Sequence, residues 1–196
     1  PRVIPGDAKS KRLAEKVAEA RAAGKKSLFG KMWVYSGLWE APYNIFDFRV
    51  SRHRDGPDEF LKTSRCKVQG DCFSGNTSVV LQSDGRLEFV ACWSHARRKV
   101  ETATSYQEEA NQLLRLIQAL YDIETRAKDM NWEQREELRL RESNVVLRGM
   151  KKWLDHPAMD RVLPKSDFAE AVRYIRNHWS ALNVFVRDGR IPIDNN

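Results

Sequence analysis

Two aspartates, Asp7 and Asp71, are the residues whose types and positions most favour a chemical role. Asp71 directly follows the short stretch 66–70, and Asp7 comes shortly after the apolar pair Val3-Ile4. Each would stand where a strand ends and a loop begins, the edge at which open α/β sheets gather ligands and catalytic groups. Carboxylates that converge at such an edge can hold the Mg²⁺ ions that phosphodiester cleavage uses. The alternative, that both are ordinary loop acids, stays open at this point.

Cysteine and histidine offer a second constellation. Cys92 and His95 have a local C-x-x-H spacing, and Cys66 and Cys72 lie upstream of them. No second tight pair has the spacing of a structural zinc site, so zinc is disfavoured. The case for Cys72 or Cys92 as a nucleophile is weaker still. The sequence also lacks a glycine-rich phosphate loop and a serine nucleophile elbow.

The run Arg97-Arg98-Lys99 is the most prominent local basic cluster. Arginine can bind phosphates through two parallel hydrogen bonds, which suits a nucleic-acid backbone. A helix that begins near Trp93 would add its positive N-terminal dipole. A solvated helix face explains the run nearly as well.

Short strands must position these candidates. Residues 31–36 and 45–51 are rich in aromatic and β-branched residues, which predicts an antiparallel hairpin with Phe46, Phe48 and Val50 on a half-buried face. The stretch 74–81 is compatible with either helix or strand. The other predicted elements of this half are an exposed helix over 8–23, a short helix over 58–63 with Phe60 and Leu61 facing inward, a strand that ends at Asp71, and a buried strand over 87–92.

The chain changes character after about His95, where helical periodicity replaces strand signals as far as Val186. Asp167 and Glu170 are spaced like a capping pair at the start of the last long helix. Three apolar stripes predict the core-facing sides of the helices: Leu113, Leu114, Ile117, Leu120 and Tyr121; Val146, Met150, Trp153 and Leu154; and Phe168, Val172, Ile175, Trp179 and Leu182.

Composition sets the broad class. The 196 residues carry a formal net charge of +7, which leans mildly toward a polyanionic partner. Three cysteines form no disulfide framework and fit a reducing compartment. No apolar run approaches the ~20 residues that span a bilayer, so a cytosolic protein without a membrane partner is expected.

Several ordered motifs resemble those of transposases of the insertion-sequence 66 family. They run from about Lys31 to the last residue. The most distinctive is the stretch from Ala91 to Lys99, which contains Cys92 and His95. The others are Trp33-Val34-Tyr35, Pro42-Tyr43-Asn44-Ile45-Phe46-Asp47-Phe48, Ser51-Arg52, Asp55-Gly56-Pro57, Gln69-Gly70-Asp71-Cys72-Phe73-Ser74-Gly75, Pro164-Lys165-Ser166, Asp188-Gly189 and Ile193-Asp194-Asn195-Asn196.

The resemblance implies an α/β fold, a ribonuclease-H-like mixed sheet with a large all-helical insertion. It implies a catalytic core over 1–93, the insertion over 94–187 and a return toward the core over 188–196. Asp71 corresponds to the second acid of an Asp-Asp-Glu metal triad. The third acid lies just beyond the Asp-Asn-Asn, so the 196 residues would stop before the last core helix.

Other positions take their expected roles from the same resemblance. Cys92 and His95 correspond to a family motif that follows the last core strand. Their expected role is structural: they position neighbouring residues. The family's first acid usually stands in Asp-Glu-Thr, whereas Asp7 is followed by Ala8-Lys9. Leu38 stands where relatives often carry an acid.

The implied function is metal-dependent DNA strand cleavage and strand transfer during transposition. Asp71 and Asp7 would hold Mg²⁺ or Mn²⁺, and Arg97, Arg98 and Lys99 would contact the DNA backbone. The expected partners are transposon ends and target DNA in the bacterial cytoplasm or nucleoid. Self-association in a transposition complex is also possible for a protein of this family. The alternative is an inactive transposase remnant that at most binds DNA non-specifically. Whether the chain is an active enzyme stays open.

Overall fold

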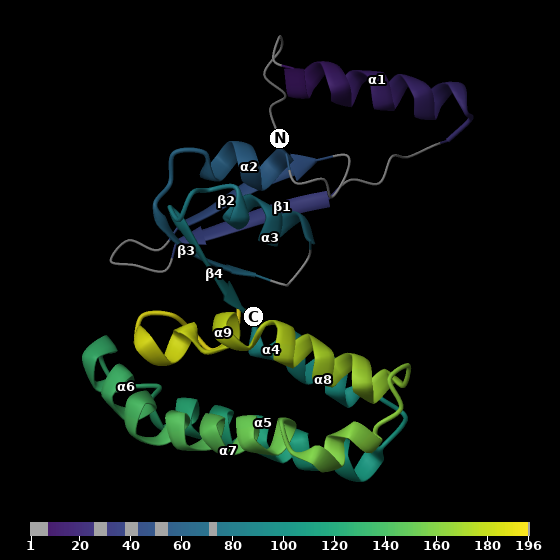
Figure 1. Ribbon diagram of the computed structural model, residues 1–196. Coiled ribbons are helices and arrows are strands. Elements are labelled where there is room, and N and C mark those ends of the chain that lie inside the picture. The colour runs from purple at the N-terminus through teal and green to yellow at the C-terminus, as the bar shows by residue number, and fades with distance from the viewer. Residues whose placement is uncertain (1–7, 26–30, 38–42, 50–54, 71–73, 196) are drawn as a thin grey trace. The chain divides into compact units, whose positions relative to one another are not determined.

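A computed structural model describes residues 8–25, 31–37, 43–49, 55–70 and 74–195. The described part is mixed α/β and mostly helical, with two small sheets. The chain divides into two compact units, residues 1–63 and 64–196 (Figure 1). The predicted strand around Val3-Ile4 and both candidate acids, Asp7 and Asp71, lie outside the described residues.

The first unit contains the helix α1 (Ala8–Ala22), the strands β1 (Lys31–Gly37) and β2 (Tyr43–Arg49), and the helix α2 (Asp55–Leu61). The two strands pair antiparallel along their whole length, which confirms the predicted hairpin. Aromatic and β-branched residues fill both strands, as expected for a pleated surface.

The helix α2 begins three residues earlier than predicted and packs through its last turn. Leu61 is buried, as predicted. Phe60 stacks on Tyr35 of β1, with ring centroids 3.9 Å apart and the planes 21° from parallel. Stacked rings attract each other beyond the effect of the area that they bury, so this contact holds α2 against the hairpin.

The prediction that Phe46 is half-buried is wrong. Val34 and Phe46 are register partners in the hairpin, and their exposed fractions are 51% and 66%. Strand alternation shows which residues share a face of a sheet, but it does not show whether another layer covers that face. The side chain of Phe48 and all of Val50 lie outside what the structure describes.

The second unit begins with a β-α-β arrangement of the strand β3 (Cys66–Gly70), the helix α3 (Ser74–Leu81) and the strand β4 (Leu87–Ala91). The two strands are parallel, with Gly70 opposite Ala91. A parallel pair needs a crossover, and α3 supplies it, so the stretch left open between helix and strand is helical.

A block of helices follows β4 in the second unit, as the periodicity predicts (Figure 1). It contains a single π-helical segment, η1, between α6 and α7. The elements are α4 (Trp93–Glu101), α5 (Gln107–Arg126), α6 (Trp132–Leu138), η1 (Arg139–Ser143), α7 (Asn144–Leu154), η2 (Pro157–Arg161), α8 (Asp167–Asn177), α9 (Trp179–Leu182) and η3 (Val184–Arg187).

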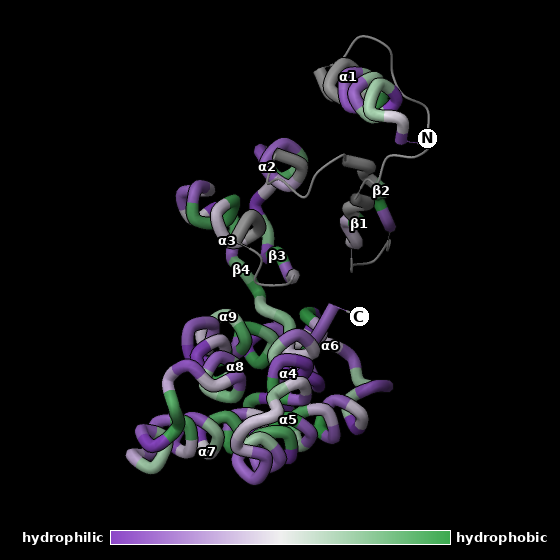
Figure 2. Tube along the Cα trace, turned by 90° about the vertical axis from the view of Figure 1, so that its right-hand side faces the viewer, coloured by the Kyte–Doolittle hydropathy of each residue, from purple (hydrophilic) through white to green (hydrophobic). Residues whose placement is uncertain are grey.

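The core of the second unit joins β4 to the helical block. Figure 2 shows that apolar and polar residues alternate along the helices of this block, and the buried apolar residues of α4, α5, α7 and α8 form one cluster. Trp93 is fully buried, and its indole N–H donates to the carbonyl of Leu182 at 2.8 Å. Most predicted stripe residues are buried, and the others are partly buried against the same cluster, so the predicted helix faces are confirmed.

The predicted capping role of Asp167 is wrong by one residue. Ser166 caps α8, because its hydroxyl accepts from the amide of Ala169. Asp167 instead holds the loop between α4 and α5. Its carboxylate accepts from the amide and hydroxyl of Thr104, at 2.6 and 2.7 Å, and from the amide and hydroxyl of Ser105. These hydrogen bonds, led by the Ser105 hydroxyl, lower the pKa of Asp167.

Asp167→Asn is expected to destabilise the protein at neutral pH and to matter much less in acid. A carboxyl whose pKa is lowered by folding stabilises the folded state above its unfolded pKa of about 4, and this contribution is lost as the pH falls through the lower folded value. Urea midpoints of both proteins between pH 7 and pH 2 should converge. The exposed Asp160 provides the control, Asp160→Asn. Parallel curves for wild type and Asp167→Asn would contradict the assignment.

Candidate functional site

The candidate site is the edge of the small parallel sheet at the carboxyl ends of β3 and β4. The chain leaves β3 at Gly70, directly before Asp71, and leaves β4 at Ala91, directly before the buried Cys92. Because the strands are parallel, both exits lie on the same edge, the usual position of ligands in open α/β sheets. Asp7 and Asp71 themselves remain predictions, because the structure does not describe them.

The last part of the chain returns to this edge. We call residues 184–195 the return segment. The amide side chain of Gln69 donates to the carbonyl of Pro192 at 2.7 Å, and the backbone N–H of Trp93 donates to the carbonyl of Ile193 at 3.2 Å. One contact comes from the end of β3 and the other from the first turn of α4. The return segment therefore crosses the end of the parallel sheet.

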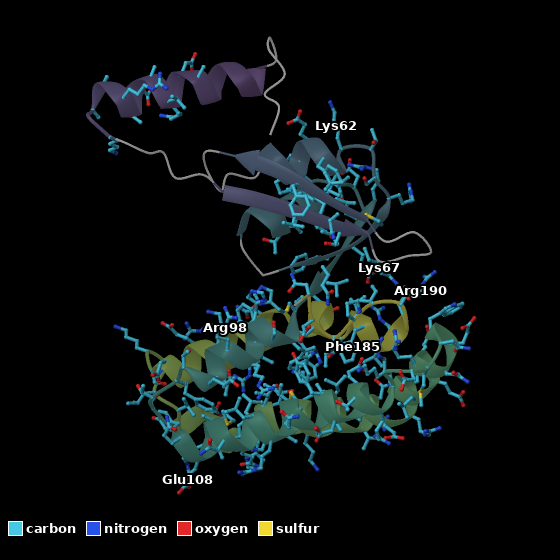
Figure 3. The ribbon with its side chains drawn as sticks, turned by 180° about the vertical axis from the view of Figure 1, so that it is seen from behind. Lys62, Lys67, Arg98, Glu108, Phe185 and Arg190 are labelled. Carbon is cyan, nitrogen blue, oxygen red and sulfur yellow. The ribbon has the colours of Figure 1, made fainter. Side chains whose placement is uncertain are left out.

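A buried aspartate fixes the start of this crossing. Asp188 accepts from Lys67 of β3 at 2.6 Å and receives two bonds from the guanidinium of Arg190, at 2.8 and 3.0 Å. Figure 3 labels Lys67 and Arg190 on the side of the second unit where this contact lies. Arg190 foremost, and Lys67 after it, lower the pKa of Asp188 despite its burial. The carboxylate is thus kept charged between two cations.

The helical block holds the return segment through Arg139, whose side chain is fully buried. Its Nε and Nη2 donate to the two oxygens of Glu124 on α5, at 2.8 and 2.6 Å. Its Nη1 donates to the carbonyls of Phe185, Asp188 and Ile191, at 2.8, 3.1 and 2.9 Å. The carbonyl of Asp188 also accepts from the amide of Ile191. Arg139 therefore adds a charged donor to the turn that follows η3.

A second contact from the helical block reaches the end of the return segment. The hydroxyl of Tyr121, on α5, donates to the carboxylate of Asp194 at 2.7 Å. Burial raises the pKa of Tyr121, and its bond to Asp194 raises it further, so the phenol stays protonated as a donor. The guanidinium of Arg97 lies 5.7 Å from the centre of the same ring.

The motif residues Cys92 and His95 flank the start of α4. Cys92 is fully buried, with its sulfur 3.0 Å from the hydroxyl of Ser94. The Nδ1 of His95 is buried and has no hydrogen-bond partner within the described part of the chain. A structural and positioning role for both stays a prediction.

The predicted DNA-binding run divides into different environments. Arg97 pairs with Glu101 at 2.8 Å, in addition to its contact with Tyr121. Lys99 lies over the ring of Tyr174, 5.0 Å from its centre. Arg98 is exposed on α4 (Figure 3). Two of the three cations thus have intramolecular contacts, and DNA contact by all three stays a prediction.

Clusters of metal ligands and membrane-spanning helices are both absent among the described residues. Among residues outside the gaps in the structure, no three histidine, cysteine, aspartate or glutamate side chains cluster as metal ligands. Asp7 and Asp71 lie in those gaps. None of the described helices combines the length and apolar character that crossing a membrane requires.

Sequence reasoning missed Lys67, Tyr121, Arg139, Asp188 and Arg190 as site-forming residues. One signal was available for Arg139. It continues the spacing of the buried positions Ser143, Leu147, Met150 and Leu154, so a charged residue occupies the apolar stripe. A charge on a core-facing stripe indicates a buried ion pair or a capped backbone.

Comparison with known proteins identifies relatives over nearly the whole chain. The pattern of the family described as "Transposase IS66 family" matches residues 14–196. Three curated proteins of Sinorhizobium fredii, all named as uncharacterized, are similar. The protein y4hP is 23% identical over 89% of this chain, y4jD is 31% identical over 56%, and y4qI is 29% identical over 84%.

The chain spans 35%, 22% and 33% of the lengths of y4hP, y4jD and y4qI, respectively. No solved structure matches it.

Proposed function

Because the chain belongs to the transposase IS66 family, we propose that it forms the catalytic core of a DNA transposase. The proposed fold is ribonuclease-H-like, with a core over 1–93, a helical insertion over 94–187 and a return to the core over 188–196. The proposed reaction is metal-dependent cleavage of DNA at transposon ends, followed by strand transfer.

The observation that carries this proposal is the path of the return segment. Pro192 and Ile193 are held at the carboxyl ends of β3 and β4 by Gln69 and Trp93. Asp71 directly follows β3, and the family resemblance places the third acid shortly after Asn196. Residues separated by more than a hundred positions in the sequence thus come to one sheet edge, the arrangement that a carboxylate triad requires.

The donor chemistry fits the proposed metal. Aspartate oxygens are the ligands that Mg²⁺ and Mn²⁺ prefer, so Asp71 and Asp7 suit either ion. A bound pair of ions would supply activation of the attacking oxygen and stabilisation of the leaving oxygen. The two aspartates would hold the ions, and the rigid strand end before Asp71 would orient its carboxylate.

The helix α4 supplies the proposed contact with DNA. Arg98 is exposed, so it is free to approach a phosphate. Arg97 and Lys99 would reach the backbone from their contacts with aromatic rings or would brace the helix. Cys92 and His95 would fix the start of α4. Transposon ends and target DNA in the bacterial nucleoid are the proposed partners, with self-association in the transposition complex.

Asp71→Asn is expected to abolish strand cleavage while DNA retention stays intact. The test uses a transposase chain that continues past Asn196 through the third acid. The substitution removes one negative oxygen that would hold Mg²⁺ but leaves the size of the side chain unchanged. Cleavage of an end-labelled duplex carrying the transposon end, measured with and without Mg²⁺, checks the first part, and filter retention of the same duplex checks the second.

Asp84→Asn is the matched control, because Asp84 is an exposed aspartate of the same unit with a φ of 49°, a conformation that asparagine tolerates. Loss of both cleavage and retention in Asp71→Asn, or loss of neither, would contradict the role of Asp71. A wild-type chain that retains DNA only in a salt-sensitive way and never cleaves it would instead support the inactive remnant.

A further inference from the structure

Specific side-chain contacts from the helical insertion hold the return segment, in addition to the shared apolar core. Arg139 holds the carbonyls of residues 185, 188 and 191, and Tyr121 holds the carboxylate of Asp194. Both residues belong to the insertion, whereas Lys67 and Gln69 hold the same segment from β3. The return segment is thus fixed from two sides.

We propose that Tyr121 is a positioning residue for DNA cleavage, which acts by holding Asp194 so that the return segment crosses the carboxyl ends of β3 and β4 in one register. This inference rests on the proposed function. Asp194 directly follows Ile193, whose carbonyl accepts from the first N–H of α4. The Tyr121 bond therefore holds the chain from the side of the insertion shortly before the position where the third acid is expected.

The geometry favours positioning over simple packing. The Tyr121 ring is only partly buried against the core, whereas its hydroxyl makes a short bond to a single carboxylate oxygen. Arg97 lies over the ring and helps to fix its orientation. Displacing a catalytic group by about 1 Å can lower the reaction rate about a hundredfold. Asp194 lies one residue before the described end of the return segment, so loss of its anchor could displace the residues that follow.

Tyr121→Phe tests the proposal, because it removes one hydroxyl and keeps the ring. In the full-length transposase we expect kcat for transposon-end cleavage to fall about ten- to a hundredfold, with an unchanged KM for DNA and a higher Mg²⁺ concentration at half-maximal rate. Hydrogen exchange of the Trp93 amide, which donates to Ile193, should accelerate. The exchange measurement needs no activity, so it reports on the segment alone.

Tyr106→Phe is the matched control. The Tyr106 hydroxyl also bridges two segments, accepting from the amide of Leu163 at 2.9 Å, but it makes no described contact with the return segment. We expect a comparable change in thermal stability, with no change in kcat or in Trp93 exchange. Asp194→Asn, which keeps an acceptor oxygen, should retain most of the rate. In an Asp194→Ala background, Tyr121→Phe should have no further effect.

The outcomes separate the inference from the function on which it rests. If wild type and Tyr106→Phe cleave DNA and Tyr121→Phe cleaves equally well, the inference is overturned and the proposed function stands. Equal exchange at Trp93 in all three proteins overturns it as well. If neither the wild-type protein nor any variant cleaves DNA with Mg²⁺, the proposed function fails, and the role of Tyr121 in cleavage fails with it. Faster exchange of the Trp93 amide in Tyr121→Phe alone would still support the anchoring of the return segment.

Discussion

Arg139→Met is expected to lower the free energy of unfolding by about 3–5 kcal/mol, the usual cost of breaking a buried ion pair by removing one partner. The substitution leaves the mostly buried carboxylate of Glu124 without its cation and strips the carbonyls of Phe185, Asp188 and Ile191 of a shared donor. Methionine fills a similar volume, so the loss is electrostatic rather than a cavity. Urea unfolding followed by tryptophan fluorescence measures it, since Trp93 is fully buried in the same unit.

Arg126→Met is the control for Arg139→Met. Arg126 also pairs with a glutamate, Glu142, but 56% of its side chain is exposed. Exposed pairs are worth about 0–1 kcal/mol, so this variant should stay close to wild type. Adding Glu124→Leu to Arg139→Met should recover only part of the loss, because the three carbonyls of the return segment still lack their charged donor. Equal costs for the two arginine substitutions would show that the buried network contributes no more than a surface pair.

Gly189→Ala is expected to destabilise the protein by about 1–3 kcal/mol or more, the range for forced overpacking. A Cβ at this position would overlap the carbonyl oxygen of Trp132 and lie 2.8 Å from its carbonyl carbon, and both belong to the backbone of α6. The clash cannot be relieved by a side-chain rotation. Gly189 also donates to Glu136 and accepts from Arg135, so moving it disturbs the first turns of α6.

Gly149→Ala gives the opposite expectation and serves as the control. Gly149 lies inside α7, and a Cβ there would meet no atom within 4 Å. Alanine in an open helix interior stabilises by about 0.5–1 kcal/mol relative to glycine. Thermal unfolding of both variants should therefore shift in opposite directions. A Gly189→Ala protein as stable as wild type would mean that the contact between the return segment and α6 is loose.

The sequence predicted the helices correctly where buried residues recur with the period of a helix. The stripe around Leu113 and Ile117 and the stripe around Phe168 and Val172 predicted α5 and α8, because a helix that packs on one side repeats its apolar residues on that side. The β1–β2 hairpin was predictable from the aromatic and β-branched residues that fill both strands. The exposure of Phe46 was not, since it depends on which other layer covers the sheet.

The contacts that build the candidate site could not be predicted in the same way. Arg139 and Arg141 stand in the same run of charged residues, and only the spacing of Arg139 to the apolar positions that follow separates the buried arginine from the exposed one. Its partners on the return segment are backbone carbonyls, which every residue possesses, so no side-chain pattern identifies them. Asp167 was expected to cap its own helix, but its partners, Thr104 and Ser105, lie on a distant loop.

The path of the return segment also sets an order for assembly during synthesis. Lys67 and Gln69 meet Asp188 and Pro192 across 121 and 123 positions of sequence. At about 5–20 residues per second, the ribosome needs roughly 6–25 s to make the intervening chain. The helices α4 to α7 can form within that interval, although α4 also packs on the later helix α8. The end of β3 must wait for partners that do not yet exist. Closure of this long loop is therefore the late step, and the β3 edge is the surface that a nascent-chain chaperone would have to protect.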